Sequence, residues 1–135
     1  MDIKRLLISS LLFLVSHMIS AQNNYSPGYI ITLEQDTVHG LIDLRTDKMN
    51  ARCCVFKQDT DVSPTAYYPG DIWGYRFEDE GKLYISHSIE LKHDSVANQL
   101  FFECLFQGMK NLYYYENDDN EEFYFLESQG RLVKL

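Results

Sequence analysis

The sequence predicts an all-β domain, a small antiparallel sandwich or barrel of about nine strands that follows a cleaved signal peptide. Aromatic and β-branched residues, which suit a pleated surface, gather in short runs. Glycine, proline or polar residues separate these runs at spacings of roughly 8–12 residues. Strand-like and helix-like segments do not alternate, which argues against a parallel α/β sheet.

The beginning of the chain has the organisation of a secretory signal peptide. Lys4 and Arg5 supply positive charge, residues 6–19 are largely apolar, and two small residues precede the expected cleavage site. The apolar segment is shorter than the roughly 20 residues of a membrane-spanning helix, although an uncleaved anchor is the alternative. We therefore expect residues 1–21 to be removed. Residues 22–135 then form a single all-β domain that is secreted, to the periplasm or the outer cell surface.

The chain is acidic. Its net charge of −8 becomes about −9 when the expected signal peptide, which carries a net charge of +1, is removed. Nucleic-acid binding depends on clustered Lys and Arg, and the acidity also opposes docking on an anionic membrane. We therefore expect no nucleic-acid partner, and no membrane span in the mature chain.

The domain is expected to open with a hairpin. Residues 28–33 and 37–44 are apolar and β-branched runs on either side of a short polar break. Gly40, inside the second run, suggests a bulge or the close approach of another backbone. The polar residues 22–27 are expected to be a loose leader, and residues 51–57 to be the next strand.

The middle of the chain contains shorter signals. Residues 45–50 are polar and predict a connection without regular structure. The Pro69-Gly70 pair predicts a turn within residues 66–77. Residues 82–86 form a further strand, and residues 88–92 continue it or pair with it.

Residues 99–128 predict three consecutive antiparallel strands, a meander at the centre of the fold. Gly108 and the acidic block 116–122 divide the three runs. Residues 96–105 also fit a helical spacing, but their adjacent aromatic residues favour a strand. Residues 131–135 are expected to form a short final strand. The aromatic residues of the meander are Phe101, Phe102, Phe106, Tyr113, Tyr114, Tyr115, Phe123, Tyr124 and Phe125.

The cysteines leave two alternatives. Export permits disulfides without requiring them. Neighbouring residues of a strand point to opposite faces, so Cys53 and Cys54 cannot both face one partner. Cys104 could pair with Cys53 or with Cys54, and buried free thiols are the other interpretation.

Four phrases occur in order behind the expected signal peptide: GYIITLEQDTVHGLID, YYPGDIWGY, FFECLFQGMKNLYYY and YFLESQGRLVKL. Together they resemble a family of uncharacterised secreted proteins from Gram-negative bacteria of the Bacteroidota type. Members often carry glycine where Gln35 stands, so we expect the same hairpin here with a different turn. The resemblance implies location and fold, and it implies no activity.

No catalytic or metal-binding constellation is evident. His39, His87 and His93 lack the helical spacing of metal-ligand pairs, and we expect no cofactor and no metal. The acidic run 116–122 offers oxygen ligands for calcium but lacks the glycine and spacing of a calcium loop, so a solvated hairpin loop is expected. The triplets at Thr37 and Ser95 resemble an O-glycosylation acceptor, with ordinary turn residues as the alternative.

The tyrosines give the best functional lead. In a strand, Tyr113 and Tyr115 share one face and Tyr114 takes the other. Exposed aromatic rings stack on sugars and anchor protein interfaces. We therefore predict a ligand-binding surface at Tyr113, Tyr114, Tyr115 and Trp73, with packing in the core or at a sheet edge as the alternative.

These observations favour a non-catalytic secreted β module that binds an envelope protein or a glycan, and not an enzyme. The alternative is a small exported hydrolase whose site is built from scattered carboxylates and histidines. A deep pocket with a titratable group of shifted pKa would favour the hydrolase. A flat aromatic face or a free sheet edge would favour the binding module.

Overall fold

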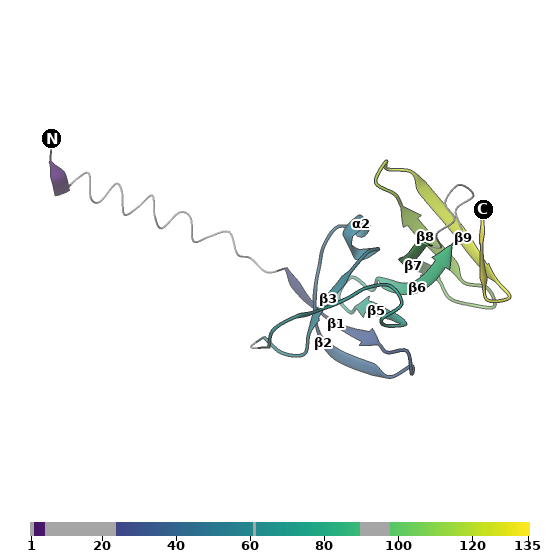
Figure 1. Ribbon diagram of the computed structural model, residues 1–135, viewed down its shortest axis with the longest axis horizontal. Helices are drawn as coiled ribbons and strands as arrows, with labels where there is room; N and C mark the ends of the chain where they lie inside the picture. The colour runs from purple at the N-terminus through teal and green to yellow at the C-terminus, as the bar shows by residue number, and fades with distance from the viewer. Residues whose placement is uncertain (1, 5–23, 61, 90–97) are drawn as a thin grey trace.

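The computed structural model describes residues 2–4, 24–60, 62–89 and 98–135, so most of the expected signal peptide lies outside the described residues. Within them the chain is all-β, and ten strands form one antiparallel, sandwich-like sheet that does not close into a barrel (Figure 1). The all-β antiparallel class is therefore confirmed. The strands are β1 (Tyr25–Ile31), β2 (Thr37–Asp43), β3 (Cys54–Lys57), β4 (Thr65–Tyr67), β5 (Gly74–Phe77), β6 (Leu83–Ile89), β7 (Asn98–Phe106), β8 (Leu112–Glu116), β9 (Glu122–Ser128) and β10 (Arg131–Lys134).

The sheet consists of two meanders joined by its first strand. The strand order is β10-β9-β8-β7-β6-β5-β1-β2-β3-β4. β1 lies between β2 and β5, and Ile30 of β1 is opposite Val38 of β2 and Tyr75 of β5. Figure 1 shows β1–β3 and β8–β9 in different halves of the domain, with β5 and β6 between them.

Two core clusters lie on opposite faces of this sheet. Neighbouring residues such as Phe101 and Phe102 belong to different clusters, because successive side chains of a strand point to opposite faces. The central strands are therefore buried on both faces. The first core cluster contains Ile30, Ile42, Cys54, Phe56, Ile72, Tyr75, Phe77, Tyr84 and Phe101. The second contains Ile31, Leu83, Ile85, Ile89, Phe102, Tyr113 and Phe125.

Two details differ from the sequence predictions. β1 begins at Tyr25, so part of the expected leader is a strand. Pro27 is tolerated there because its backbone faces β5 at the end of the β1–β5 pairing, where its carbonyl accepts from the Glu78 amide at 3.0 Å, so no bond to β2 is lost. The polar connection contains a short helix, α2 (Asp47–Asn50), whose N-cap Thr46 accepts a hydrogen bond from the Met49 amide.

The close backbone approach predicted at Gly40 is confirmed. A Cβ atom at this position would lie 2.4 Å from the Lys57 carbonyl oxygen and 2.7 Å from the Phe56 ring. The pairing of β2 with β1 runs in register past Gly40, so no bulge is present at this point. The glycine therefore lets β3 pack tightly against β2.

Candidate binding surface

Strands β8–β10 carry apolar side chains on both faces of the sheet. One face, which we call the inner face, contributes Tyr113 and Phe125 to the second core cluster. On the other face, pairing places Phe106, Leu112, Leu126 and Val133 in one row, and Tyr114 beside Tyr124 in the next. Leu135 joins the second row, since its amide donates to the Tyr124 carbonyl at 2.9 Å. We call this set the outer face: Phe106, Leu112, Tyr114, Tyr124, Leu126, Val133 and Leu135.

The outer face is open to solvent. Phe106 is 62% exposed, Tyr124 40%, Val133 52% and Leu135 72%. None of the outer-face residues belongs to either core cluster of the described chain. Tyr113, which belongs to the inner face of the same strands, is only 2% exposed. One side of this three-strand unit is thus covered by the protein itself. On the other side four of the seven residues are exposed, and Leu112, Tyr114 and Leu126 are half-buried.

The four residues predicted as a ligand-binding surface do not lie together. Tyr113 is buried in the second core cluster, and Tyr115 and Trp73 pack against it. Tyr115 also contacts the rings of Phe102 and Phe123. Tyr114 alone belongs to the outer face. The alternation of faces expected for the three tyrosines is therefore present, while Trp73 lies on the side opposite Tyr114.

Tyr114 is held by its neighbours. Its ring lies 5.4 Å from that of Tyr124, tilted by 51°. Its hydroxyl lies 3.3 Å from a Glu122 carboxylate oxygen and 3.5 Å from one of Glu116, and its single proton is donated to one of them at a time. Burial, together with these carboxylates, raises the pKa of Tyr114 to about 12, so the hydroxyl remains a proton donor at neutral pH. The ring is consequently fixed in orientation at the border between the outer face and an acidic cluster.

That acidic cluster consists of Asp47 and Glu103, with Lys82 between them, and it joins α2 to β6 and β7. Lys82 Nζ lies 2.7 Å from Asp47 and 3.9 Å from Glu103, and the Tyr84 hydroxyl donates to Asp47 at 3.1 Å. Burial raises the pKa of Glu103, and the Lys82 charge opposes this shift. Burial lowers the pKa of Lys82, but its hydrogen bond to Asp47 and the charge of Glu103 outweigh that, so the pKa is raised.

The chemistry available to this cluster is limited by space. Asp47, Tyr84, Glu103, Tyr114 and Glu116 line a small cavity of about 10 Å³, enough for roughly one water molecule. A carboxyl group with a raised pKa can donate a proton, but a substrate needs room beside it. Because Asp47 is already engaged by Lys82 and Tyr84, the arrangement is that of a structural polar contact.

The acidic loop between β8 and β9 folds toward α2. Arg52 contacts Asp118, and Lys48 Nζ lies 3.5 Å from Glu116. Asn117 organises the turn, since its side-chain oxygen accepts from the amides of Asp119 and Glu121. Within the described residues, no group of three or more His, Cys, Asp or Glu side chains is arranged to hold a metal ion.

The cysteines, all in described segments, carry free thiols in this structure. Cys54 is in the first core cluster and Cys104 packs against the second, on the opposite face of the sheet, so the structure contains no Cys104–Cys54 bridge. Cys53 is half-buried and is not bonded to Cys104 either. Burial raises the pKa of each of the three thiols.

The remaining predicted positions are scattered. His39 is exposed and lies 3.0 Å from Glu78, whereas His87 is half-buried between the rings of Phe102 and Tyr113. Thr37 is exposed at the start of β2. His93 and Ser95 lie outside the described residues.

Comparison with known proteins gives no relative. No family model, no curated protein and no solved structure matches the chain. In the part of the chain that the structure describes, none of the helices has the length and apolar character needed to cross a membrane. Among the features described above, the outer face is the one that suggests a function.

Proposed function

We propose that the protein is a non-catalytic secreted β module whose outer face binds another protein of the cell envelope. The exposed rows of apolar side chains on β8–β10 carry this proposal. Contiguous exposed apolar patches are uncommon on monomeric proteins and mark interaction sites. The sequence supports the location, through the expected signal peptide and the resemblance to uncharacterised secreted proteins of Gram-negative bacteria.

The composition of the outer face suits a protein partner. Leucine and valine side chains dominate one row, and two tyrosines occupy the other. Aliphatic groups gain from exclusion of water against another apolar surface, and tyrosines are frequent anchors of protein interfaces. The acidic residues Glu116 and Glu122 border the patch, as polar rims border interface cores.

The outer face can be tested with two matched tyrosine variants. Tyr124→Ala removes an exposed ring from the outer face, and Tyr68→Ala removes a 58% exposed ring elsewhere. Purified protein immobilised on beads is incubated with envelope extract, and the bound proteins are quantified by mass spectrometry. We expect at least one protein to be captured by the wild type and by Tyr68→Ala, and at least tenfold less of it by Tyr124→Ala. Equal capture by all three proteins would remove the outer face from consideration.

A glycan partner is the second candidate, and the Tyr114–Tyr124 pair favours it. The two rings are held at an angle and one of them is exposed, which is a geometry on which a sugar can stack. For this candidate, Tyr114→Ala should reduce retention on a column of envelope polysaccharide without changing the circular dichroism spectrum. Unchanged retention would exclude the glycan at this site and leave a protein as the remaining candidate partner.

We place no reaction in the cluster of Asp47, Lys82 and Glu103. Its cavity admits about one water molecule, and the Asp47 carboxylate is bonded to Lys82 and Tyr84. The hydrolase alternative therefore has less support than the binding module.

A further inference from the structure

β10 forms one end of the sheet, and its outer edge is unpaired within the described residues. The Leu135 amide donates to Tyr124 of β9, which fixes the direction of the backbone groups along the strand. In an antiparallel ladder, alternate residues bond to the same neighbour. Arg131, Val133 and Leu135 therefore face β9, and the N–H and C=O groups of Leu132 and Lys134 point away from the sheet.

The opposite end of the sheet carries prolines that β10 lacks. β4 has only three residues, and prolines at positions 64 and 69 stand close to its two ends. Short edge strands and nearby prolines prevent the addition of further strands. β10 contains no proline, and the pairing between β9 and β10 runs without a bulge. β10 is also short, with four residues, but neither a proline nor a bulge obstructs an added strand at this end of the sheet.

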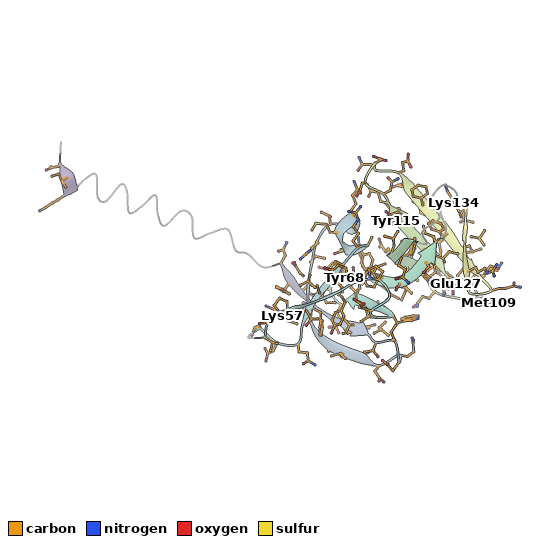
Figure 2. The ribbon with its side chains drawn as sticks, viewed as in Figure 1. Lys57, Tyr68, Met109, Tyr115, Glu127 and Lys134 are labelled. Carbon is orange, nitrogen blue, oxygen red and sulfur yellow. The ribbon has the colours of Figure 1, made fainter. Side chains whose placement is uncertain are left out.

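The edge at β10 is basic, although the protein as a whole is acidic. Arg131 and Lys134 are both exposed and, being three residues apart, lie on opposite faces of the strand. Neither forms an ion pair within the described chain, and Lys134 lies 4.5 Å from the centre of the Phe123 ring. Figure 2 shows Lys134 at the side of the molecule away from Lys57. A second copy would bring two basic edges together, whereas an acidic strand would complement this one.

We propose that an extended, acidic segment of the partner protein adds to β10 as a further antiparallel strand. This inference rests on the proposed function for the partner being a protein. The outward N–H and C=O groups of Leu132 and Lys134 pair with the segment. Its carboxylates face Arg131 and Lys134, and an apolar residue beside Val133 extends the outer face. Backbone pairing supplies affinity and the flanking charges supply selectivity in this mode of recognition.

Two peptides, together with two variants at position 134, test whether an acidic strand adds to the edge of β10. The probes are fluorescent eight-residue peptides in a polarisation assay. One carries glutamates three positions apart with valine after the first (T-T-E-V-T-E-T-T), so that its carboxylates lie on opposite faces like Arg131 and Lys134, and the other carries lysine at both glutamate positions. The acidic peptide should bind the wild type at least tenfold more tightly than the basic one. Lys134→Ala removes one charge and keeps the N–H, so it should weaken binding several-fold. Lys134→Pro removes the N–H as well and should weaken binding at least tenfold further.

A charge-reversed variant gives a result that does not depend on proline being tolerated. The double change Arg131→Glu with Lys134→Glu should bind the basic peptide and lose the acidic one, with an unchanged circular dichroism spectrum. Equal binding of both peptides, or Lys134→Pro behaving like Lys134→Ala, would overturn the proposed strand addition. So would a dimer in sedimentation that Lys134→Pro dissociates, because the occupant of the edge would then be a second copy.

Failure of this inference can be distinguished from failure of the proposed function. If capture of the envelope partner is lost in Tyr124→Ala but kept in Lys134→Pro and in the charge-reversed variant, the outer face binds and the edge does not. If capture is the same in all of these proteins, the proposed function itself fails.

Discussion

Tyr113 and Tyr114 are consecutive in β8, and their rings lie on opposite faces of the sheet in different environments. Tyr113 is buried in the second core cluster, and its hydroxyl donates to Glu127 at 3.1 Å. Tyr114 lies beside Tyr124 on the outer face. The same residue type therefore stabilises the fold at one position and shapes the candidate binding surface at the next.

This relationship predicts different costs for two alanine substitutions. Tyr113→Ala should lower the free energy of unfolding by about 3–5 kcal/mol, because it leaves a cavity in the core. Tyr114→Ala should cost less than about 1.5 kcal/mol, because its ring is only partly covered. Urea unfolding followed by circular dichroism measures both. Similar losses for the two variants would contradict the assignment of the two faces.

The alternation of these tyrosines could be predicted from the sequence, but the covered face could not. Alternation follows from the geometry of a single strand, so it needs only local information. Which face is buried depends on β6 and β7, because their side chains form the other part of the second core cluster. The separation of Trp73 from Tyr114 likewise depends on β5 pairing with β1, a contact between distant segments.

The same distinction between local and long-range information applies to three further features. A glycine inside a strand-like run is a local feature of the sequence, and the close approach of Gly40 to β3 was predicted correctly from it. The short helix α2 was missed, because four residues provide too little periodicity to recognise. The contact of Lys82 with Asp47 was missed as well, since it joins residues far apart in the sequence.

A second prediction concerns the turn between β1 and β2. Gln35 has a φ of 69°, a left-handed conformation that favours glycine. The turn is closed by hydrogen bonds from the Thr32 amide to the Asp36 carbonyl and from the Gln35 amide to the Thr32 carbonyl. Gln35→Gly should raise the free energy of unfolding by about 0.5–1 kcal/mol. Glu34→Gly is the control and should lower it, because glycine adds freedom to the unfolded chain. A loss of stability in both variants would contradict the conformation at Gln35.

A third prediction concerns pH. His87 is packed between Phe102 and Tyr113, and its Nε2 has no hydrogen-bond partner among the described residues. Burial lowers the pKa of His87 in the folded protein, and the charge of Glu127 opposes this. As pH falls below the ordinary histidine value of about 6.5, the unfolded chain takes up a proton that the folded protein does not. Stability should therefore decrease with acidification, by at most about 1.4 kcal/mol per pH unit from this group.

The variant His87→Leu isolates that contribution. It removes the titrating group and also the unpartnered nitrogen, so stability should depend less steeply on pH between about 7 and 5. Glu103 acts in the opposite direction, since a raised carboxyl pKa makes the folded state gain stability on acidification. Urea midpoints measured across this range for wild type and variant give the comparison. Parallel curves of urea midpoint against pH for the two proteins would show that His87 does not contribute to the pH dependence of stability.

A fourth prediction concerns the buried end of α2. The hydroxyl of Tyr75 donates to the backbone carbonyl of Asn50, and both residues are buried in the described structure. The Asn50 side chain in turn donates to the Arg45 carbonyl at 3.2 Å and to the Tyr84 hydroxyl at 3.4 Å. Tyr75→Phe keeps the ring and leaves this carbonyl without its donor, which should cost about 1–3 kcal/mol.

The exposed Tyr68 provides the matched control for this change. Tyr68→Phe removes the same hydroxyl from a solvated position and should alter the free energy of unfolding by no more than about 0.5 kcal/mol. Hydrogen exchange adds a local measurement, because loss of the Tyr75 bond should increase exchange at the amides of α2 more than at those of β8. Equal stability of Tyr75→Phe and Tyr68→Phe would mean that the Asn50 carbonyl finds another donor when the Tyr75 hydroxyl is removed.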